Sequence, residues 1–141
     1  LPLLREAALA APSSDILTIS STAGRVAYEG GGGYTAAKHG TTDIIETLRL
    51  ELAGEPIRVT EVAPGMVQTP EFSLNRFGGD QAAADKVYQD VQEPLTEKDV
   101  ALVIVTMLEL PKHINLDLVV MRPVAQAAQH KLVRGPLTPK L

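Results

Sequence analysis

Three short β-rich runs separated by longer helical segments most strongly constrain how this chain can fold. The runs are residues 15–21 (DILTISS), 57–63 (IRVTEVA) and 116–121 (LDLVVM). The first run is apolar enough to be a buried parallel strand. Strands that alternate with helices form βαβ units with right-handed crossovers. The sequence therefore predicts an α/β fold, with a parallel sheet of three strands and helices on its faces.

The segments between the runs carry helical signals. A long helix is predicted over residues 34–53, because apolar residues recur there with helical spacing and Gly54 supplies a C-terminal stop. A weaker helix is expected over 79–91. Residues 96–99 (TEKD) match the capping-box pattern, so another helix should begin there and run to about Leu110, before Pro111.

The two ends of the chain complete the expected organisation. Residues 1–11 look like the end of an apolar helix, and residues 124–141, which are rich in Gln, Lys and Pro, look like a tail. No repeat or linker divides the chain. We therefore expect residues 1–141 to form one domain or part of one.

Composition excludes several classes of protein. The chain has 141 residues, of which 45% are hydrophobic, so it can bury a core. Its net charge of -4 argues against a nucleic-acid or membrane surface. Cysteine is absent and the three histidines are scattered, so we expect no disulfide and no metal site. No apolar run approaches the roughly 20 residues of a membrane-spanning helix, and we expect a cytoplasmic protein.

Two polar segments follow the first two predicted strands. They are residues 21–38 (STAGRVAYEGGGGYTAAK) and 64–72 (PGMVQTPEF). In open parallel sheets, ligands bind and reactions take place beyond the carboxyl ends of the strands. The glycine run at residues 30–33 lacks the form of a phosphate-binding loop, so we interpret it as a flexible approach to the next helix. The two segments are therefore the candidates for a functional site.

Tyr34 and Lys38 stand four residues apart at the start of the long predicted helix, so their side chains should share one face. A neighbouring ammonium and the positive end of a helix both favour the phenolate form of a tyrosine. Tyr34 could then donate or accept a proton, with a hydroxyl of Ser20 or Ser21 nearby to hold a substrate oxygen. The alternative is an ordinary exposed pair on a helix surface, which spacing alone does not exclude.

Three motifs together resemble a known family. ISSTAG (residues 19–24), YTAAK (34–38) and PGMVQT (64–69) are similar, in order and separation, to the second half of a short-chain dehydrogenase/reductase. The resemblance covers nearly the whole chain. It implies the C-terminal half of a Rossmann-like doubly wound parallel sheet, with three strands and flanking helices, and with the N-terminal half of the family domain absent from these 141 residues.

The resemblance implies a role for each matching residue. In the family pattern the active serine lies thirteen residues before the tyrosine, which selects Ser21 over Ser20. Tyr34 would be the general acid/base, and Lys38 would promote its ionisation and hydrogen-bond the nicotinamide ribose. Ser21 would orient the substrate oxygen. Tyr34 and Lys38 would thus also bind the cofactor, together with a loop around the nicotinamide that comprises Pro64, Gly65, Val67 and Thr69.

The later part of the chain narrows the expected activity. Residues 70–80, 86–89 and 95–126 are similar to reductases of serine-like 3-hydroxy acids and small carbonyl compounds, which usually use NADP. The resemblance implies an oxidoreductase that interconverts an alcohol, such as a small 3-hydroxy acid, and a carbonyl by hydride transfer with NADP or NAD. Arg76 could attract an acidic substrate, or it could be a surface residue of a mobile lid.

The family's glycine-rich dinucleotide turn would lie before Leu1, so we expect these 141 residues alone not to bind NAD(P) tightly. The alternative function is a truncated, non-catalytic fragment that acts only as an oligomerisation or interaction module. In the family, the helix that begins at the tyrosine packs against its symmetry mate. The resemblance therefore implies a homo-oligomer, a dimer or tetramer, with a small-molecule substrate as its other partner.

Overall fold

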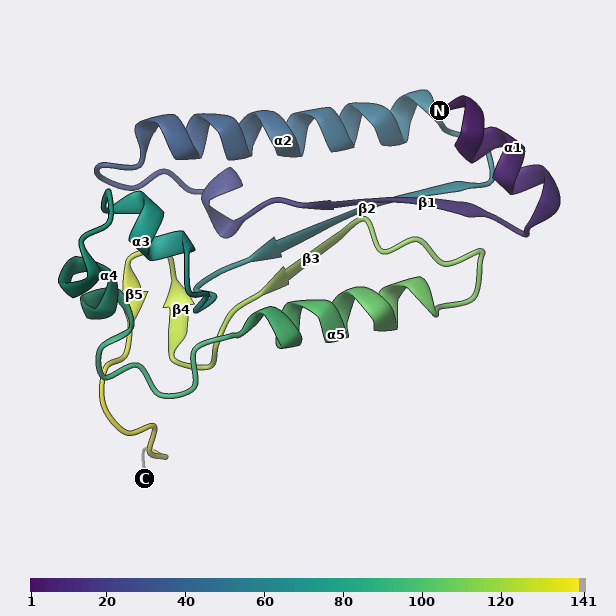
Figure 1. Ribbon diagram of the computed structural model, residues 1–141. Helices are drawn as coiled ribbons and strands as arrows, with labels where there is room; N and C mark the ends of the chain where they lie inside the picture. Colours follow the sequence, from purple (N-terminus) through teal and green to yellow (C-terminus); the bar gives the residue numbers. More distant parts are fainter. Residues whose placement is uncertain (140–141) are drawn as a thin grey trace.

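The computed structural model describes residues 1–139 and contains a parallel sheet covered by helices on both faces (Figure 1). The sheet consists of β1 (Ser14–Ile19), β2 (Ile57–Pro64) and β3 (Leu118–Met121), in the order β1-β2-β3. Both strand pairs are parallel. The predicted fold class is therefore confirmed, as are its three strands and their parallel pairing.

The helices surround this sheet in two layers. Helices α1 (Pro2–Ala10) and α2 (Gly32–Glu51) lie along one face and α5 (Glu97–Leu108) lies along the other (Figure 1). The short elements gather near the carboxyl ends of the strands: η1 (Thr22–Gly24), α3 (Phe72–Arg76), α4 (Gln81–Tyr88), β4 (Gln126–Ala128) and β5 (Lys131–Leu132). Within residues 1–139, none of the helices combines the length and apolar character that crossing a membrane requires.

The core is divided between the two faces of β2. All eight residues of this central strand are buried, and successive side chains point to opposite faces. On one face Val59 packs in a cluster with Ile45 and Leu52 of the α2 segment. On the other face Val62 packs with Val100 and Met107 of α5. β2 therefore holds both helical layers in place.

The structure differs from the sequence expectations mainly at short elements. Helix α2 begins at Gly32, inside the glycine run, rather than at Tyr34. Helix α3 has only five residues, too few to display a helical period, so it was not expected. Two short strands, β4 and β5, lie within residues 124–141, to which the sequence assigned no element. Strands of two and three residues leave no readable alternation.

The capping box predicted at the start of α5 is present. The hydroxyl of Thr96 accepts a hydrogen bond from the Asp99 amide, and the Asp99 carboxylate accepts one from the Thr96 amide at 2.7 Å. These bonds favour the charged carboxylate, so the backbone hydrogen bond from Thr96, followed by the one from its side chain, lowers the pKa of Asp99. The reciprocal bonds fix where α5 begins.

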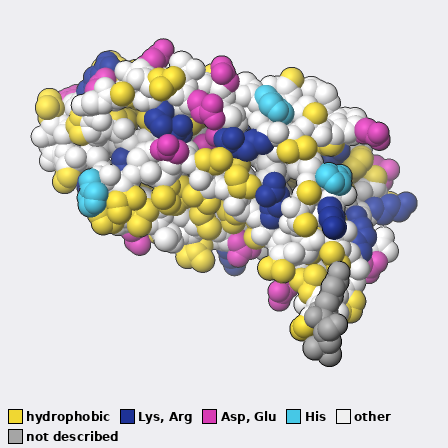
Figure 2. Space-filling view, turned by 180° about the vertical axis from the view of Figure 1, so that it is seen from behind, with side chains coloured by type: hydrophobic (Ala, Val, Ile, Leu, Met, Phe, Trp, Pro, Cys, Tyr) yellow, Lys and Arg dark blue, Asp and Glu magenta, His cyan; other side chains and the backbone are white. Residues whose placement is uncertain are grey.

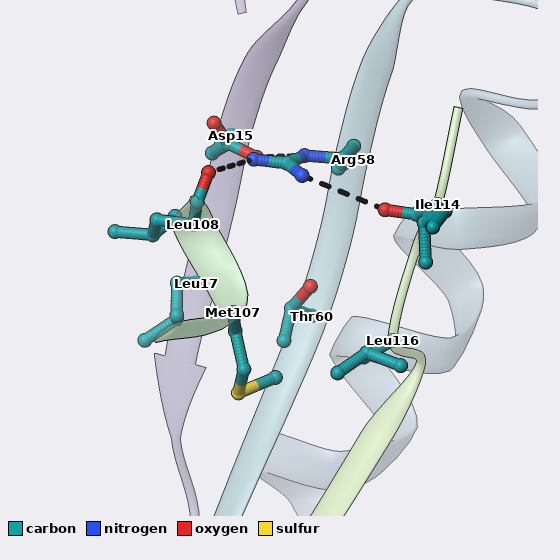
Figure 3. Close-up of a pocket in the computed structure, with 8 residues that line it drawn as sticks. All are labelled: Asp15, Leu17, Arg58, Thr60, Met107, Leu108, Ile114 and Leu116. Carbon is teal, nitrogen blue, oxygen red and sulfur yellow. Dashed lines mark hydrogen bonds and ion pairs between the residues drawn. The ribbon is translucent and has the colours of Figure 1, made fainter. Parts of the chain in front are cut away.

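A buried arginine holds the other end of α5 against the sheet (Figure 3). The Arg58 side chain on β2 donates through Nε to Asp15 of β1 at 2.5 Å. Its other nitrogens donate to the carbonyl oxygens of Leu108 at 3.0 Å and Leu110 at 3.2 Å. These carbonyls lie at the C-terminus of α5, where a cation is favourable. Arg58 therefore links β1 and the C-terminus of α5 to the amino end of β2.

Replacing this arginine tests the link. Arg58→Met should lower the free energy of unfolding by about 3 kcal/mol, because Asp15 loses its cation while it is partly buried and the helix carbonyls lose their donors. Urea denaturation measures the change. Arg5→Met is the control, because Arg5 forms an exposed pair with Glu55 and its loss should cost much less. Equal losses in the two variants would contradict the assignment.

Candidate active site

A cavity of about 640 Å³ lies at the carboxyl ends of β1 and β2. Side chains of α5 line one side of it, and the start of α2, helix α3 and the segment around β4 line the rest. The structure brings together in this one cavity all seven residues that the sequence singled out: Ser21, Tyr34, Lys38, Pro64, Gly65, Val67 and Thr69.

The two adjacent serines after β1 have different hydrogen-bond partners. The hydroxyl of Ser20 donates to the buried carboxylate of Glu61. The hydroxyl oxygen of Ser21 accepts from the amide of Ala23 at 3.1 Å and caps η1. The Ser21 hydroxyl donates only a long bond, of 3.5 Å, to the Pro64 carbonyl oxygen. The Ser20 hydroxyl is bound to the buried Glu61 carboxylate, so Ser21 is the serine whose hydroxyl can more readily turn to a ligand in the cavity.

Tyr34 and Lys38 share one face of α2, as their spacing predicted. The Lys38 ammonium lies 5.8 Å from the centre of the Tyr34 ring. The same ammonium donates to the carbonyl oxygen of Ile19 at the end of β1, at 3.3 Å. Phe72 of α3 packs edge-on against the Tyr34 ring, with ring centres 5.9 Å apart. The phenol and the ammonium are thus held side by side, and both are only half-buried.

Gly24 sets the spacing between η1 and α2. A Cβ atom at this position would lie 2.7 Å from the Lys38 carbonyl oxygen and 2.9 Å from the Thr42 hydroxyl oxygen. Both distances are too short for carbon, so only glycine permits this approach. The segment that carries Ser21 therefore lies directly against the helix that carries Tyr34 and Lys38.

The loop after β2 is fixed by a side chain from the C-terminal segment. The amide of Met66 donates to the side-chain oxygen of Gln126 at 2.9 Å. The same oxygen occupies the space where a side chain on Gly65 would begin. A side chain at residue 65 would displace the Gln126 side chain, so Gly65 permits the close contact between this loop and β4.

A second contact holds the loop from the side of α4. The Tyr88 hydroxyl donates to the carbonyl oxygen of Val67 at 3.0 Å and accepts from the buried Ser73 hydroxyl at 2.8 Å. Sequence reasoning gave no role to Tyr88 or Gln126. Neither lies in a motif with a mechanism of its own, and their partners are distant in sequence. Other cavity residues that it did not assign to the site are Tyr28, Phe72, Glu97, Ile104, Gln129 and His130.

Positive charge predominates in the cavity wall. Among the described residues, Lys38 and Arg76 line it, against the carboxylate of Glu97. The Arg76 guanidinium lies 5.6 Å from the Tyr28 ring centre, and within residues 1–139 it forms no ion pair. Figure 2 shows Lys and Arg side chains gathered toward the end of the molecule that carries the C-terminus. An anionic group could therefore be held beside Arg76.

Comparison with known proteins identifies relatives of this arrangement. The family model described as short chain dehydrogenase matches residues 3–76. An uncharacterised oxidoreductase of Mycobacterium tuberculosis is 49% identical over 122 residues, which are 86% of this chain and 48% of that protein. The NADP-dependent 3-hydroxy acid dehydrogenase of Escherichia coli K12 is 40% identical over 112 residues, 79% of this chain and 45% of that protein.

A solved structure of a dehydrogenase is also similar to this chain. The closed form of serine dehydrogenase complexed with NADP⁺ superimposes with a TM-score of 0.84 at 36% identity, over 96% of this chain and 53% of that one. The chain thus spans about half the length of the curated relatives it matches.

The contact at Gly24 can be tested by a pair of glycine substitutions. Gly24→Ala should destabilise the protein by about 1 to 3 kcal/mol, because the new methyl group would overlap the Lys38 carbonyl. Gly40→Ala is the control on α2, the helix that carries Lys38. It has nothing within 4 Å of the new Cβ, so removing a helical glycine there should stabilise by up to about 1 kcal/mol. Thermal unfolding distinguishes the two, and loss of the contrast would contradict the close approach.

Proposed function

Because the chain belongs to the short-chain dehydrogenase family, we propose that the protein is an oxidoreductase that interconverts an alcohol and a carbonyl by hydride transfer with NADP or NAD. The observation that carries the proposal is the convergence of Ser21, Tyr34 and Lys38 in one cavity at the carboxyl ends of the strands. In the proposed arrangement, residues 1–141 form part of a single dinucleotide-binding domain.

The proposed chemistry assigns one task to each of the three residues. In the direction of reduction, Tyr34 donates its phenolic proton to the substrate oxygen, and in oxidation it accepts that proton. Lys38, whose ammonium lies beside the Tyr34 ring, stabilises the phenolate that remains. Ser21 donates a hydrogen bond that orients the substrate oxygen toward Tyr34. These tasks need a proton donor, a fixed cation and a hydroxyl within one cavity.

The cavity residues fit a nicotinamide cofactor. The cofactor, when bound, supplies or accepts the hydride. The cavity volume of about 640 Å³ falls in the range of small-molecule sites and leaves room for a substrate beside a nicotinamide ring. Tyr34 and Lys38 would hold the ribose, and the loop residues Pro64, Gly65, Val67 and Thr69 would surround the ring. NADP is favoured, because the E. coli relative is NADP-dependent and the serine dehydrogenase structure contains NADP⁺.

The substrate that we propose is a small 3-hydroxy acid or the corresponding carbonyl acid. Arg76 supports this choice, because its guanidinium lines the same cavity as the proposed proton donor and forms no ion pair among residues 1–139. A guanidinium binds a carboxylate through two parallel hydrogen bonds. The E. coli relative is named for 3-hydroxy acids, which agrees with an acidic substrate.

We also propose that the protein works as a homo-oligomer in the cytoplasm. The resemblance to the family supports the oligomer, and α2 offers two exposed apolar side chains on different sides of the helix, Ile44 at 61% and Leu50 at 79% exposure. The cysteine-free sequence agrees with a reducing compartment.

The proton-transfer role of Tyr34 is tested by removing one oxygen atom. In the full-length gene product, Tyr34→Phe should lower kcat by at least about a thousandfold, whereas NADPH affinity should fall by no more than about tenfold, the value of one neutral hydrogen bond to the ribose. Steady-state kinetics and NADPH fluorescence titration measure the two effects. Tyr28→Phe is the matched control, because Tyr28 lines the same cavity without a proposed chemical task. Turnover by Tyr34→Phe at the wild-type rate would refute the role.

The acidic substrate is tested by removing the charge of Arg76. Arg76→Met should raise KM for a 3-hydroxy acid by about 10- to 100-fold, the value of one lost charged hydrogen bond. The same variant should leave KM for a neutral alcohol of equal size unchanged within about threefold. An equal rise for both substrates would show that Arg76 only shapes the cavity.

A further inference from the structure

A buried carboxylate lies in the middle of the sheet, next to the candidate site but outside the cavity. Glu61 on β2 is 1% exposed. One of its carboxylate oxygens accepts hydrogen bonds from the hydroxyls of Ser20 and Thr42, the latter at 2.9 Å. The other oxygen accepts from the Arg25 guanidinium at 2.8 Å. The three partners of Glu61 thus come from three different segments, and both of its oxygens are used.

Burying a carboxylate in this way costs free energy, and the loss of any one of its partners destabilises it. A carboxylate taken out of water loses its hydration, which only well-placed donors and a cation can replace. A hydrophobic side chain of similar volume often stabilises a protein core equally well. Stability alone therefore does not require glutamate here, and the geometry that its three bonds impose needs its own explanation.

The positions of the partners connect the network to the candidate site. Ser20 directly precedes Ser21 in the chain. Thr42 lies one helical turn after Lys38 on α2. The Ser20 and Thr42 hydroxyls donate to the same carboxylate oxygen of Glu61. One oxygen atom of Glu61 therefore ties the end of β1 to the helix that carries the phenol and the ammonium.

We propose that Glu61 is a positioning residue, which fixes the distance between the Ser21 hydroxyl and the Tyr34–Lys38 pair. This inference rests on the proposed function. Glu61 touches neither substrate nor cofactor and acts through Ser20 and Thr42. Catalysis by oriented groups loses about 100-fold for a displacement of about 1 Å, so a link of this kind affects the chemical step more than it affects binding.

The sharpest test cuts the link at its helix end. Thr42→Val removes one hydroxyl, preserves side-chain shape and leaves the cavity lining untouched, because Thr42 is not part of it. In the full-length gene product it should lower kcat by about tenfold while KM for NADPH stays within about twofold of wild type. Glu61→Asp, whose shorter carboxylate cannot reach all three partners, should lower kcat at least as much.

Thr41→Val is the matched control. Thr41 neighbours Thr42 on α2, but its hydroxyl donates only to the Ala37 carbonyl of the same helix, at 2.9 Å. Its kcat should stay within about twofold of wild type. A kcat for Thr42→Val that also stays within about twofold would overturn the proposal.

A second measurement does not depend on turnover. Hydrogen exchange in the full-length gene product should be about tenfold faster at the amides of residues 20–24 in Thr42→Val than in Thr41→Val, because the lost bond loosens the end of β1 across the network. Equal exchange at residues 20–24 would overturn the proposal. If the wild-type protein reduces no carbonyl acid, the proposed function fails, and the exchange result still decides whether Glu61 couples the two elements.

Discussion

The parallel pairing of β1 with β2 is the interaction on which the rest of this structure depends. It sets Ile19 opposite Val62, and the amide of Ser20 donates to the Val62 carbonyl oxygen at 2.8 Å. This register brings the segment that begins at Ser21 beside the loop that begins at Pro64. Because a shift by one residue would turn every side chain to the other face, the register also decides which groups reach the cavity.

The central strand secures this register with one charged side chain on each face. Arg58 faces α5 and holds its C-terminal carbonyls together with Asp15, whereas Glu61 faces α2 and holds Ser20, Thr42 and Arg25. Arg58 lies near the amino end of β2, and Glu61 lies closer to its carboxyl end, where the candidate site is. Buried charges demand a specific set of partners, so they specify the relative positions of the elements more strictly than apolar contacts do.

The sequence predicted the sheet and the long helix because each has a local signature, and the resemblance to a family predicted seven of the residues that line the cavity. Apolar β-rich runs marked β1, β2 and β3, helical spacing marked α2, and a capping box marked the start of α5. The roles of Glu61 and Arg58 were not predicted, because a charged residue in a strand normally indicates a solvated face. Gln126 and Tyr88 were also missed, since each contacts the loop after β2 across at least twenty residues of sequence. Such contacts depend on the packing of distant elements, which no local pattern records.

The proposed function requires that hydride passes directly between a nicotinamide and a small acid bound in this cavity. The most direct measurement uses NADPH in which both hydrogens at C4 of the nicotinamide are deuterium, and follows the deuterium into the product of a carbonyl acid by mass spectrometry, with the full-length gene product. Direct transfer predicts one deuterium on the carbon that bears the new hydroxyl group, in water of ordinary isotopic composition. A product formed without deuterium at that carbon would contradict the account.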